Sequence, residues 1–355
     1  MAAGPFSAAQ LSFTRPLPFP CRVCAAELRQ YLFESDTDGT PFSRQQRAIV
    51  YQRAKKELDK RPFGTQQDVY ATGYEWINHS IAPTQVVSHD FRVMVGGPAC
   101  SRSYSMSVFN ISAMSFGSLS ANAIEALNRG AKAGGFAHDT GEGSISRYHR
   151  RHGGDLIWEV GSGYFGCRND NGSFSEERFC ASAGDPQVKM IEIKLSQGAK
   201  PGHGGMLPGP KVSAEIAEAR GVPVAVDCVS PASHSAFSTP IELMRFVARL
   251  RELSGGKSTG FKLAIGHPWE WFAIAKAMLV TGITPDFIVV AAAGLAHPSE
   301  LGPQHILRRV SGERIQSFSN IYPSLYAGEL LDGEAEPAIY KFHWPRARAD
   351  SFQPA

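Results

Sequence analysis

The chain has 355 residues, of which 36 are basic and 33 acidic, for a formal net charge of +3. This length predicts two domains, or one large domain with an extension. With 43% hydrophobic and 19% charged residues, the composition is that of a globular protein and excludes a wholly disordered chain. The near balance of charge gives no general case for nucleic-acid binding. The basic run at 147–152 is interpreted as a solvated face or an anion-binding rim.

Six scattered cysteines predict no disulfide framework in a chain of this length. Cys21 and Cys24 form a CxxC pair, but no second pair or nearby Cys/His set accompanies it. Two incidental cysteines are therefore preferred to a zinc or redox site, and no metal site is predicted. No apolar run of about 18 residues predicts a membrane span, and the first residues lack the basic start and apolar core of a secretory signal. A reduced cytoplasmic setting is expected.

Residues 1–24 contain four prolines and are predicted to form a poorly ordered lead. Residues 25–109 are predicted to form an N-terminal helical arm or subdomain. Helical patterns occur in AAELRQYLFES, which starts at Ala25, and in residues 43–58, where Ser43 is a candidate N-cap. Two short strands on either side of a turn are predicted in FRVMVGG and YSMSVFN.

From Asn110 to Val290, apolar segments suited to strands alternate with segments suited to helices. The predicted strands lie in NISAMSFG, FAHDTGEG, VKMIEIKLS, VPVAVDCVSP, TGFKLAIGHP and PDFIVV. The predicted helices lie in SANAIEALNRGAKAGG, SAEIAEARG, PIELMRFVARLREL and WEWFAIAKAMLVTG. Such alternation predicts a parallel sheet, with polar residues at the strand ends as in a (β/α)8 TIM barrel. A doubly wound sheet is the alternative, but its GxGxxG fingerprint is absent.

The predicted fold class is therefore α/β, of the (β/α)8 TIM-barrel type, with an N-terminal helical arm. The barrel is expected to be incomplete, because about six strands are found where the closed fold has eight.

Residues 194–211, KLSQGAKPGHGGMLPGPK, follow a predicted strand and contain five glycines, three lysines and a histidine. Glycines let the backbone approach a ligand and expose N–H groups to anions. Lys200 and Lys211 are suited to meet a carboxylate or phosphate, and His203 is suited to donate or transfer a proton. A ligand-binding loop is preferred to a surface loop with incidental lysines.

Two further strand ends carry candidate groups. Glu142, in the TGEG loop, is suited to orient an amine or to act as acid or base, and equally to be a solvated carboxylate. Residues 113–118, AMSFGS, offer Met114 and Phe116 to a flat ring, with ordinary core at the barrel mouth as the alternative.

Lys262 lies inside an apolar strand, where a lysine is rarely buried without a partner. The open alternatives are a contact with a phosphate or flavin, a Schiff base after the pKa is lowered, and an internal salt bridge.

These segments resemble the FMN-binding synthase domain of glutamate synthase, and in particular the stand-alone glutamate-synthase-like proteins of bacteria. The resemblance is carried by MSFGSLS, HDTGEGSISRYHR, GSGYFGCRN, KLSQGAKPGHGGMLPGPKV, VDCVSPASHSAFSTPIEL and KLAIGHPWE. It runs from about Ala25 to Val290 and resumes at Ala291.

The resemblance implies a TIM barrel that binds FMN at its mouth and an oxidoreductase acting on CH–NH2 donors. Reduced FMN would pass a hydride to 2-iminoglutarate, formed from 2-oxoglutarate and ammonia, to give L-glutamate. Ammonia would be free or derived from glutamine by a partner, since no glutaminase domain is present, and an electron-donor partner is expected. His203 stands where the large enzymes usually carry glutamate, which leaves the substrate open.

Carried over motif by motif, the resemblance assigns three sets of residues. Those expected at the flavin are Met114, Ser115, Phe116, Gly117, Thr140, Gln197 and Lys262. Those expected at the substrate are Lys200, Gly202, Gly204 and Gly205, and those expected to be catalytic are Glu142, Lys200 and His203.

After PDFIVV the family continues with a glycine loop, two more strands, a phosphate loop and three closely spaced cysteines for an iron–sulfur cluster. The sequence has none of these. Residues 291–355 instead resemble the C-terminal tail of the stand-alone proteins, so 110–290 is predicted to be a partial barrel that ends at an internal deletion.

Weak or absent FMN binding is therefore expected. An inactive remnant or a gene-model artefact is the alternative to the family's activity, and a Schiff-base lyase at Lys262 is the less favoured one.

Overall fold

The computed structural model describes residues 44–57, 68–77, 88, 90–196, 205–290, 306–322, 324–333, 335 and 337–355. The chain divides into two compact units, Met1–Val69 and Tyr70–Ala355. In the first unit, helix α2 (Arg44–Ala54) confirms the helix predicted within 43–58. The helix predicted from Ala25 lies outside the described residues, and so does Ser43, the candidate N-cap of the helix that forms α2.

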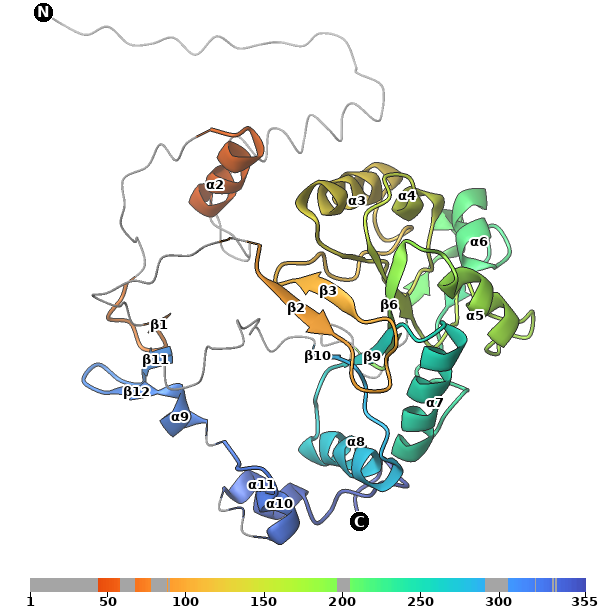
Figure 1. Cartoon of the computed structure of the whole chain (residues 1–355). Helices are drawn as coiled ribbons and strands as arrows, with labels where there is room; N and C mark the ends of the chain where they lie inside the picture. The colour runs from red at the N-terminus through yellow and green to blue at the C-terminus, as the bar shows by residue number, and fades with distance from the viewer. Residues whose placement is uncertain are drawn as a thin grey trace, which may run out of the picture. The chain divides into compact units, whose positions relative to one another are not determined.

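The second unit is built on a parallel sheet of five strands in the order β10, β9, β6, β5, β4 (Figure 1). Their bounds are β4 (His138–Asp139), β5 (Leu156–Val160), β6 (Val188–Lys194), β9 (Ser258–Leu263) and β10 (Ile288–Val290). Ile111 makes one parallel bridge to His138, at the position of a further strand beside β4. The sheet curls into a half barrel, which confirms the predicted α/β class with an incomplete TIM barrel.

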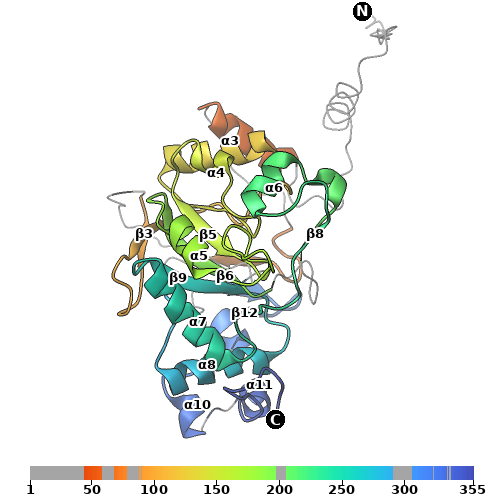
Figure 2. The same cartoon turned by 90° about the vertical axis from the view of Figure 1, so that its right-hand side faces the viewer.

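Helices follow the strands along the outer side of the sheet (Figure 2). They are α3 (Ala121–Gly134), α4 (Arg147–Arg150), α5 (Glu176–Ala183), α6 (Ala214–Arg220), α7 (Pro240–Leu253) and α8 (Pro268–Thr281). Four of these were predicted, and their ends have the expected chemistry. The Ser120 side chain accepts from the N–H of Ala123 at the start of α3, Thr239 and Glu242 form a capping box on α7, and Gly282 ends α8 in the left-handed region.

The strand predictions were wrong in three places. NISAMSFG was predicted to be a strand, but it forms only isolated bridges at Ile111 and Phe116. No strand was predicted at LIWEV, which forms β5; all five residues are buried, and Glu159 interrupts an otherwise apolar run. VPVAVDCVSP was predicted to be a sheet strand, but only β8 (Cys228–Val229) is extended, and it pairs antiparallel with β7 (Met206–Leu207). The reason is topological: β6 pairs directly with β9, so the sheet has no place between them. The 3-10 helix η1 (Gly209–Lys211) follows β7.

The outward side chains of the strands form the main core with the helices. Trp158 of β5, Ile193 of β6 and Phe261 of β9 pack in one cluster with Leu243 and Val247 of α7. This buried apolar layer fixes the position of the sheet against its helices.

The inward side chains begin with an apolar floor at the amino-terminal ends of the strands. Ile157 and Met190 are buried there, and Tyr104 and Met106 of a hairpin pack against them. The hairpin is formed by β2 (Arg92–Val95) and β3 (Tyr104–Ser107), which confirms the two short strands predicted on either side of a turn.

The C-terminal residues form a small sheet and three short helices. β11 (Ile306–Arg309) pairs antiparallel with β12 (Ile315–Ser317) and with β1 (Glu75–Ile77). The helices are α9 (Phe318–Ile321), α10 (Glu329–Asp332) and α11 (Ala338–His343). Lys276 of α8 donates to the carbonyl of Ala347 at 2.9 Å, so the end of the chain is fastened to the barrel helices.

The junction at Val290–Ala291 and the first residues of the predicted tail lie outside the described residues. Within the described ranges, no helix has the length and apolarity needed to cross a membrane. The predicted domain bounds at 24, 109 and 290 stay predictions.

Candidate functional site

A charged layer lies above the apolar floor of the half barrel. Side chains alternate between the two faces of a strand. Because Ile157 and Met190 face inward, Glu159 and Glu192, two residues further along the same strands, also face inward. Asp139 comes from β4 and Lys262 from β9, and all four residues are at most 8% exposed. The interior of a TIM barrel is normally filled by branched apolar side chains, so this layer requires an explanation.

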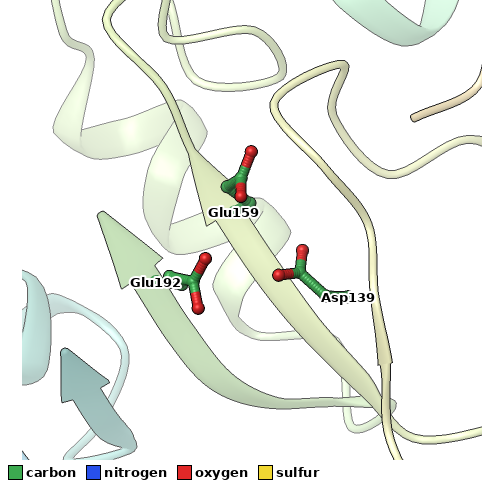
Figure 3. Close-up of side chains that lie close together, drawn as sticks. All are labelled: Asp139, Glu159 and Glu192. Atoms are coloured by element: carbon green, nitrogen blue, oxygen red, sulfur yellow. The ribbon is translucent and has the colours of Figure 1, made fainter. Parts of the chain in front are cut away.

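The three carboxylates point toward one another from adjacent strands (Figure 3). One oxygen from each of Asp139, Glu159 and Glu192 lies within 4.8 Å of the others, a spacing that could surround a cation. The Lys262 ammonium supplies positive charge here: its Nζ lies 3.1 Å from Glu192 Oε1 and also contacts Glu159 Oε2. Three carboxylates facing one ammonium leave an excess of negative charge, which a bound proton reduces.

Asp139 and Glu192 are the two groups whose pKa values favour holding this proton. Burial raises the pKa of Glu192 well above its usual value, and the negative charge of Asp139 and a hydrogen bond to it raise that pKa further. Burial also raises the pKa of Asp139, against the opposing effect of Lys262. Two adjacent buried carboxyl groups cannot both ionise readily, so the pair retains a proton that separate carboxylates would release.

A second pair of charges lies at the mouth, where the strands end. Lys194 is the last residue of β6 and lies in register with Lys262 of β9. Its Nζ lies 3.1 Å from Glu142 Oε1, in the loop after β4. Gly205, predicted at the substrate, lies against Glu142, because a Cβ added there would approach Oε1 to 2.2 Å. Glu142, Gly205 and Lys262 thus share one end of the half barrel.

The AMSFGS residues and Thr140 lie beside this end but are engaged in packing. Phe116 is buried in a cluster with Leu207 and Ile216. This matches the alternative given for Phe116 in the sequence analysis, an ordinary core residue at the barrel mouth. Thr140 is fully buried, and its Oγ1 accepts from the N–H of Glu159 at 3.2 Å. Ser115 donates to the Ser118 hydroxyl at 2.9 Å. The roles of these residues at a flavin stay predictions.

The predicted residues Gln197, Lys200, Gly202, His203 and Gly204 lie outside the described residues. For Lys262 the structure shows the internal ion pair, which was one of the three alternatives. The other two alternatives, a flavin contact and a Schiff base, would use the same ammonium and stay predictions.

Sequence reasoning missed Asp139, Glu159, Glu192 and Lys194. Glu192 and Lys194 lie in VKMIEIK, on the same face as the buried Met190. The argument that singled out Lys262, a charge within an apolar strand, applies equally to them.

The basic run at 147–152 is a face of ion pairs. Its arginines pair with carboxylates of other elements: Arg147 with Glu215, Arg150 with Asp185, and Arg151 with Glu125. The structure therefore favours the solvated-face interpretation.

An FMN would require a cradle of backbone N–H groups or cations for its phosphate. In the described residues, the lysines at the strand ends are already paired with carboxylates, and Phe116 is covered by core side chains. This set suits a small polar ligand at the mouth, but it provides no phosphate cradle. We therefore assign no chemical step to a flavin.

Comparison with known proteins agrees with this architecture. The family described as "Conserved region in glutamate synthase" matches residues 93–294. The glutamate synthase large subunit-like protein YerD of Bacillus subtilis (strain 168) is 34% identical over 305 residues, covering 74% of this chain and 58% of its own length. The archaeal-type glutamate synthase (NADPH) of Thermotoga neapolitana is 37% identical over 179 residues, covering 50% of this chain and 32% of its own length.

The glutamate synthase large subunit-like protein of Rhizobium meliloti (strain 1021) is 34% identical over 145 residues, covering 41% of this chain and 30% of its own length. The chain thus spans between about a third and three fifths of the length of these relatives.

Proposed function

Because the chain belongs to the glutamate synthase family, we propose that it acts in the reaction of that family, the FMN-dependent reductive amination of 2-oxoglutarate to L-glutamate. We propose further that it retains the 2-oxo acid part of the site and holds FMN weakly. Ammonia and electrons would come from partners or from free reagents.

The observation that supports this proposal is the charged interior at the carboxyl ends of the strands. Lys194, at the mouth, pairs with Glu142, and the Glu142 side chain is 18% exposed. A substrate carboxylate can replace Glu142 as the partner of Lys194 without leaving the ammonium unpaired. Below it, the Asp139–Glu192 pair holds a proton within the same interior. Lys194 would bind the carboxylate of a 2-oxo acid, and the Asp139–Glu192 pair would supply a proton to it.

The alternative is an inactive remnant of the family. The alignment with the Bacillus protein extends over 305 positions but takes in only 74% of the 355 residues here, so part of that relative lies opposite gaps in this chain. Such gaps are what an internal deletion, here proposed after Val290, would produce. A half barrel lacking its later strands also lacks the backbone that would hold the cofactor phosphate.

The experiment supplies the cofactor in excess. The purified full chain is incubated anaerobically with reduced FMN, 2-oxoglutarate and ammonium, and the L and D isomers of glutamate are measured separately. We expect an excess of L-glutamate that depends on the protein and is lost in Lys194→Met. Lys189→Met, an exposed lysine of the same strand, is the control and should keep the activity. Racemic glutamate at the level of free flavin would favour the inactive remnant.

A further inference from the structure

Lys262 combines three features that the proposed reaction does not use together. Its amine lies inside the half barrel, it contacts two carboxylates, and one of these, Glu192, lies beside the carboxyl group of Asp139, whose proximity raises the pKa of Glu192. A buried amine beside an acid is the arrangement that condenses with a carbonyl group. We propose that Lys262 forms a Schiff base with a 2-oxo acid, without any flavin. The choice of a 2-oxo acid as the ligand rests on the proposed function, whereas the reactivity of Lys262 does not.

The position of Lys194 selects a 2-oxo acid among carbonyl compounds. Lys194 and Lys262 are in register on neighbouring parallel strands, whose backbones lie about 4.8 Å apart. In a 2-oxo acid the carboxylate and the carbonyl carbon are directly bonded. A ligand whose carboxylate pairs with Lys194 therefore presents its carbonyl carbon toward Lys262. Glu142, the present partner of Lys194, lies at the mouth and can turn toward solvent.

The carboxylates around Lys262 supply the proton transfers. Glu159 accepts a proton from the ammonium, and the neutral amine attacks the carbonyl carbon. The C–N bond forms as the carbonyl π pair moves to oxygen, which takes a proton from the Asp139–Glu192 pair to give a carbinolamine. The nitrogen then returns one of its two protons to the carboxyl pair. Glu159 protonates the hydroxyl, and the nitrogen lone pair expels it as water, which breaks the C–O bond and leaves a C=N bond with one proton on nitrogen. Glu159 is then ionised again, the carboxyl pair again holds its proton, and no electrons are exchanged.

Overall, an ammonium and a ketone become a protonated imine and water, so atoms and charge balance. The product keeps one positive charge at the Lys262 nitrogen. The contacts with Glu159 and Glu192 therefore remain favourable before and after the reaction. Burial also lowers the pKa of Lys262 from its ordinary value, which increases the fraction of neutral amine.

Among the described residues the other buried lysine, Lys257, lacks this arrangement. Lys257 is 3% exposed, and burial lowers its pKa to about 8. Its ammonium, however, donates to the backbone carbonyls of Ala183 and Asp185, away from the charged layer. Lys257 therefore has a lowered pKa without the buried carboxyl cluster that surrounds Lys262, which makes it a matched control for the effect of pKa alone.

The test is reductive trapping of the full chain with 2-oxoglutarate and cyanoborohydride, with no flavin added. Intact mass and peptide mapping should show one adduct for each chain, at Lys262. Lys262→Arg, which keeps the positive charge, should give no adduct, and Lys257→Arg should react like the parent. Glu192→Gln, which removes the shared acid, should slow adduct formation at least tenfold while Lys262 stays present. Circular dichroism checks that each variant is folded.

Absence of an adduct in the folded parent would overturn the proposal, as would an adduct that persists in Lys262→Arg or is spread over surface lysines. Failure of the proposed function gives a different pattern. A chain that yields no L-glutamate with excess FMN can still form the Lys262 adduct, whereas a chain that makes L-glutamate without the adduct keeps the first proposal and loses the second.

Discussion

Lys194 of β6 and Lys262 of β9 lie in register on neighbouring strands, and each is paired with a different carboxylate: Lys194 with Glu142 and Lys262 with Glu192. Two ammonium groups on adjacent strands repel unless each has a partner. The two lysine side chains are equally buried, at 10% exposed, but the Glu192 side chain is 1% exposed whereas that of Glu142, at the mouth, is 18% exposed. We therefore expect Lys262 to contribute more than Lys194 to the free energy of unfolding.

Lys262→Met should lower the free energy of unfolding by about 3–5 kcal/mol, because it leaves Glu159 and Glu192 buried without their cation. Lys194→Met should cost about 1 kcal/mol or less, because the Glu142 side chain can be solvated at the mouth. Urea unfolding at neutral pH measures both. Adding Glu192→Gln to Lys262→Met should restore part of the loss. Equal losses of unfolding free energy in Lys262→Met and Lys194→Met would contradict a larger contribution from the buried pair.

The buried pair His138 and His149 should make the protein sensitive to mild acid. Burial lowers the pKa of His138 to about 3 and that of His149 to about 4. Between these values and the ordinary pKa of 6.5, the unfolded chain binds protons that the folded chain does not. Stability is therefore fully present above pH 6.5 and is lost as pH falls toward 4, by about 1.4 kcal/mol for each pH unit and each histidine.

His138→Leu tests this directly. Within the described part of the chain neither ring nitrogen of His138 has a hydrogen-bond partner, so an apolar side chain should raise stability at neutral pH by about 1 kcal/mol or more. It should also make stability less dependent on pH between 4 and 6.5. Urea unfolding at pH 5 and pH 7.5 gives both quantities. An unchanged slope would assign the acid sensitivity to other groups.

Glu192→Gln should change stability in the opposite pH range. The raised pKa of Glu192 means that the folded protein keeps a proton that the unfolded chain loses above about pH 4.5. Its contribution is therefore favourable in acid and is lost as pH rises. Glutamine imitates the protonated form, so the variant should match the parent near pH 4.5 and exceed it at pH 8. Glu176→Gln is the control: it breaks an exposed pair with Arg249, which lowers the Glu176 pKa, and no gain at pH 8 is expected.

Substitution of Gly141 should cost more stability than its left-handed backbone conformation alone would cause. Gly141 has φ +64, and a Cβ there would lie 2.8 Å from the backbone N of Ser115. Gly153 has nearly the same φ, +69, with open space around its Cβ position. Gly153→Ala should cost about 1 kcal/mol for the left-handed backbone alone. Gly141→Ala should cost clearly more, because the AMSFGS loop must also move. Equal thermal unfolding losses would contradict this.

The purified protein should carry little flavin. We expect an FMN content well below one for each chain after gel filtration, measured by absorbance after release of the cofactor. The reason is that the described strand ends offer paired lysines and no phosphate cradle. A stoichiometric yellow protein would contradict both this expectation and the proposed loss of the phosphate loop.

The helices on the outer face could be predicted because their signals are local. Thr239, Pro240 and Glu242 mark the start of α7 within four residues, and Gly282 marks the end of α8. The charged layer could not be predicted in the same way. Asp139, Glu159 and Glu192 come together only because three strands separated by helices pair in one register, and no local pattern specifies that pairing. β5 was missed for a related reason, since Glu159 makes a buried strand look polar until its partners are known.

The small sheet of β1, β11 and β12 joins a segment that precedes the barrel in the sequence to a segment that follows it. β1 precedes the barrel in the sequence and β11 follows it, and Glu75, Trp76 and Ile77 pair with Arg308, Leu307 and Ile306. A single proteolytic nick in any loop between them therefore leaves two fragments that are still joined by a backbone ladder. Such fragments should migrate together on a native gel and separate only after denaturation.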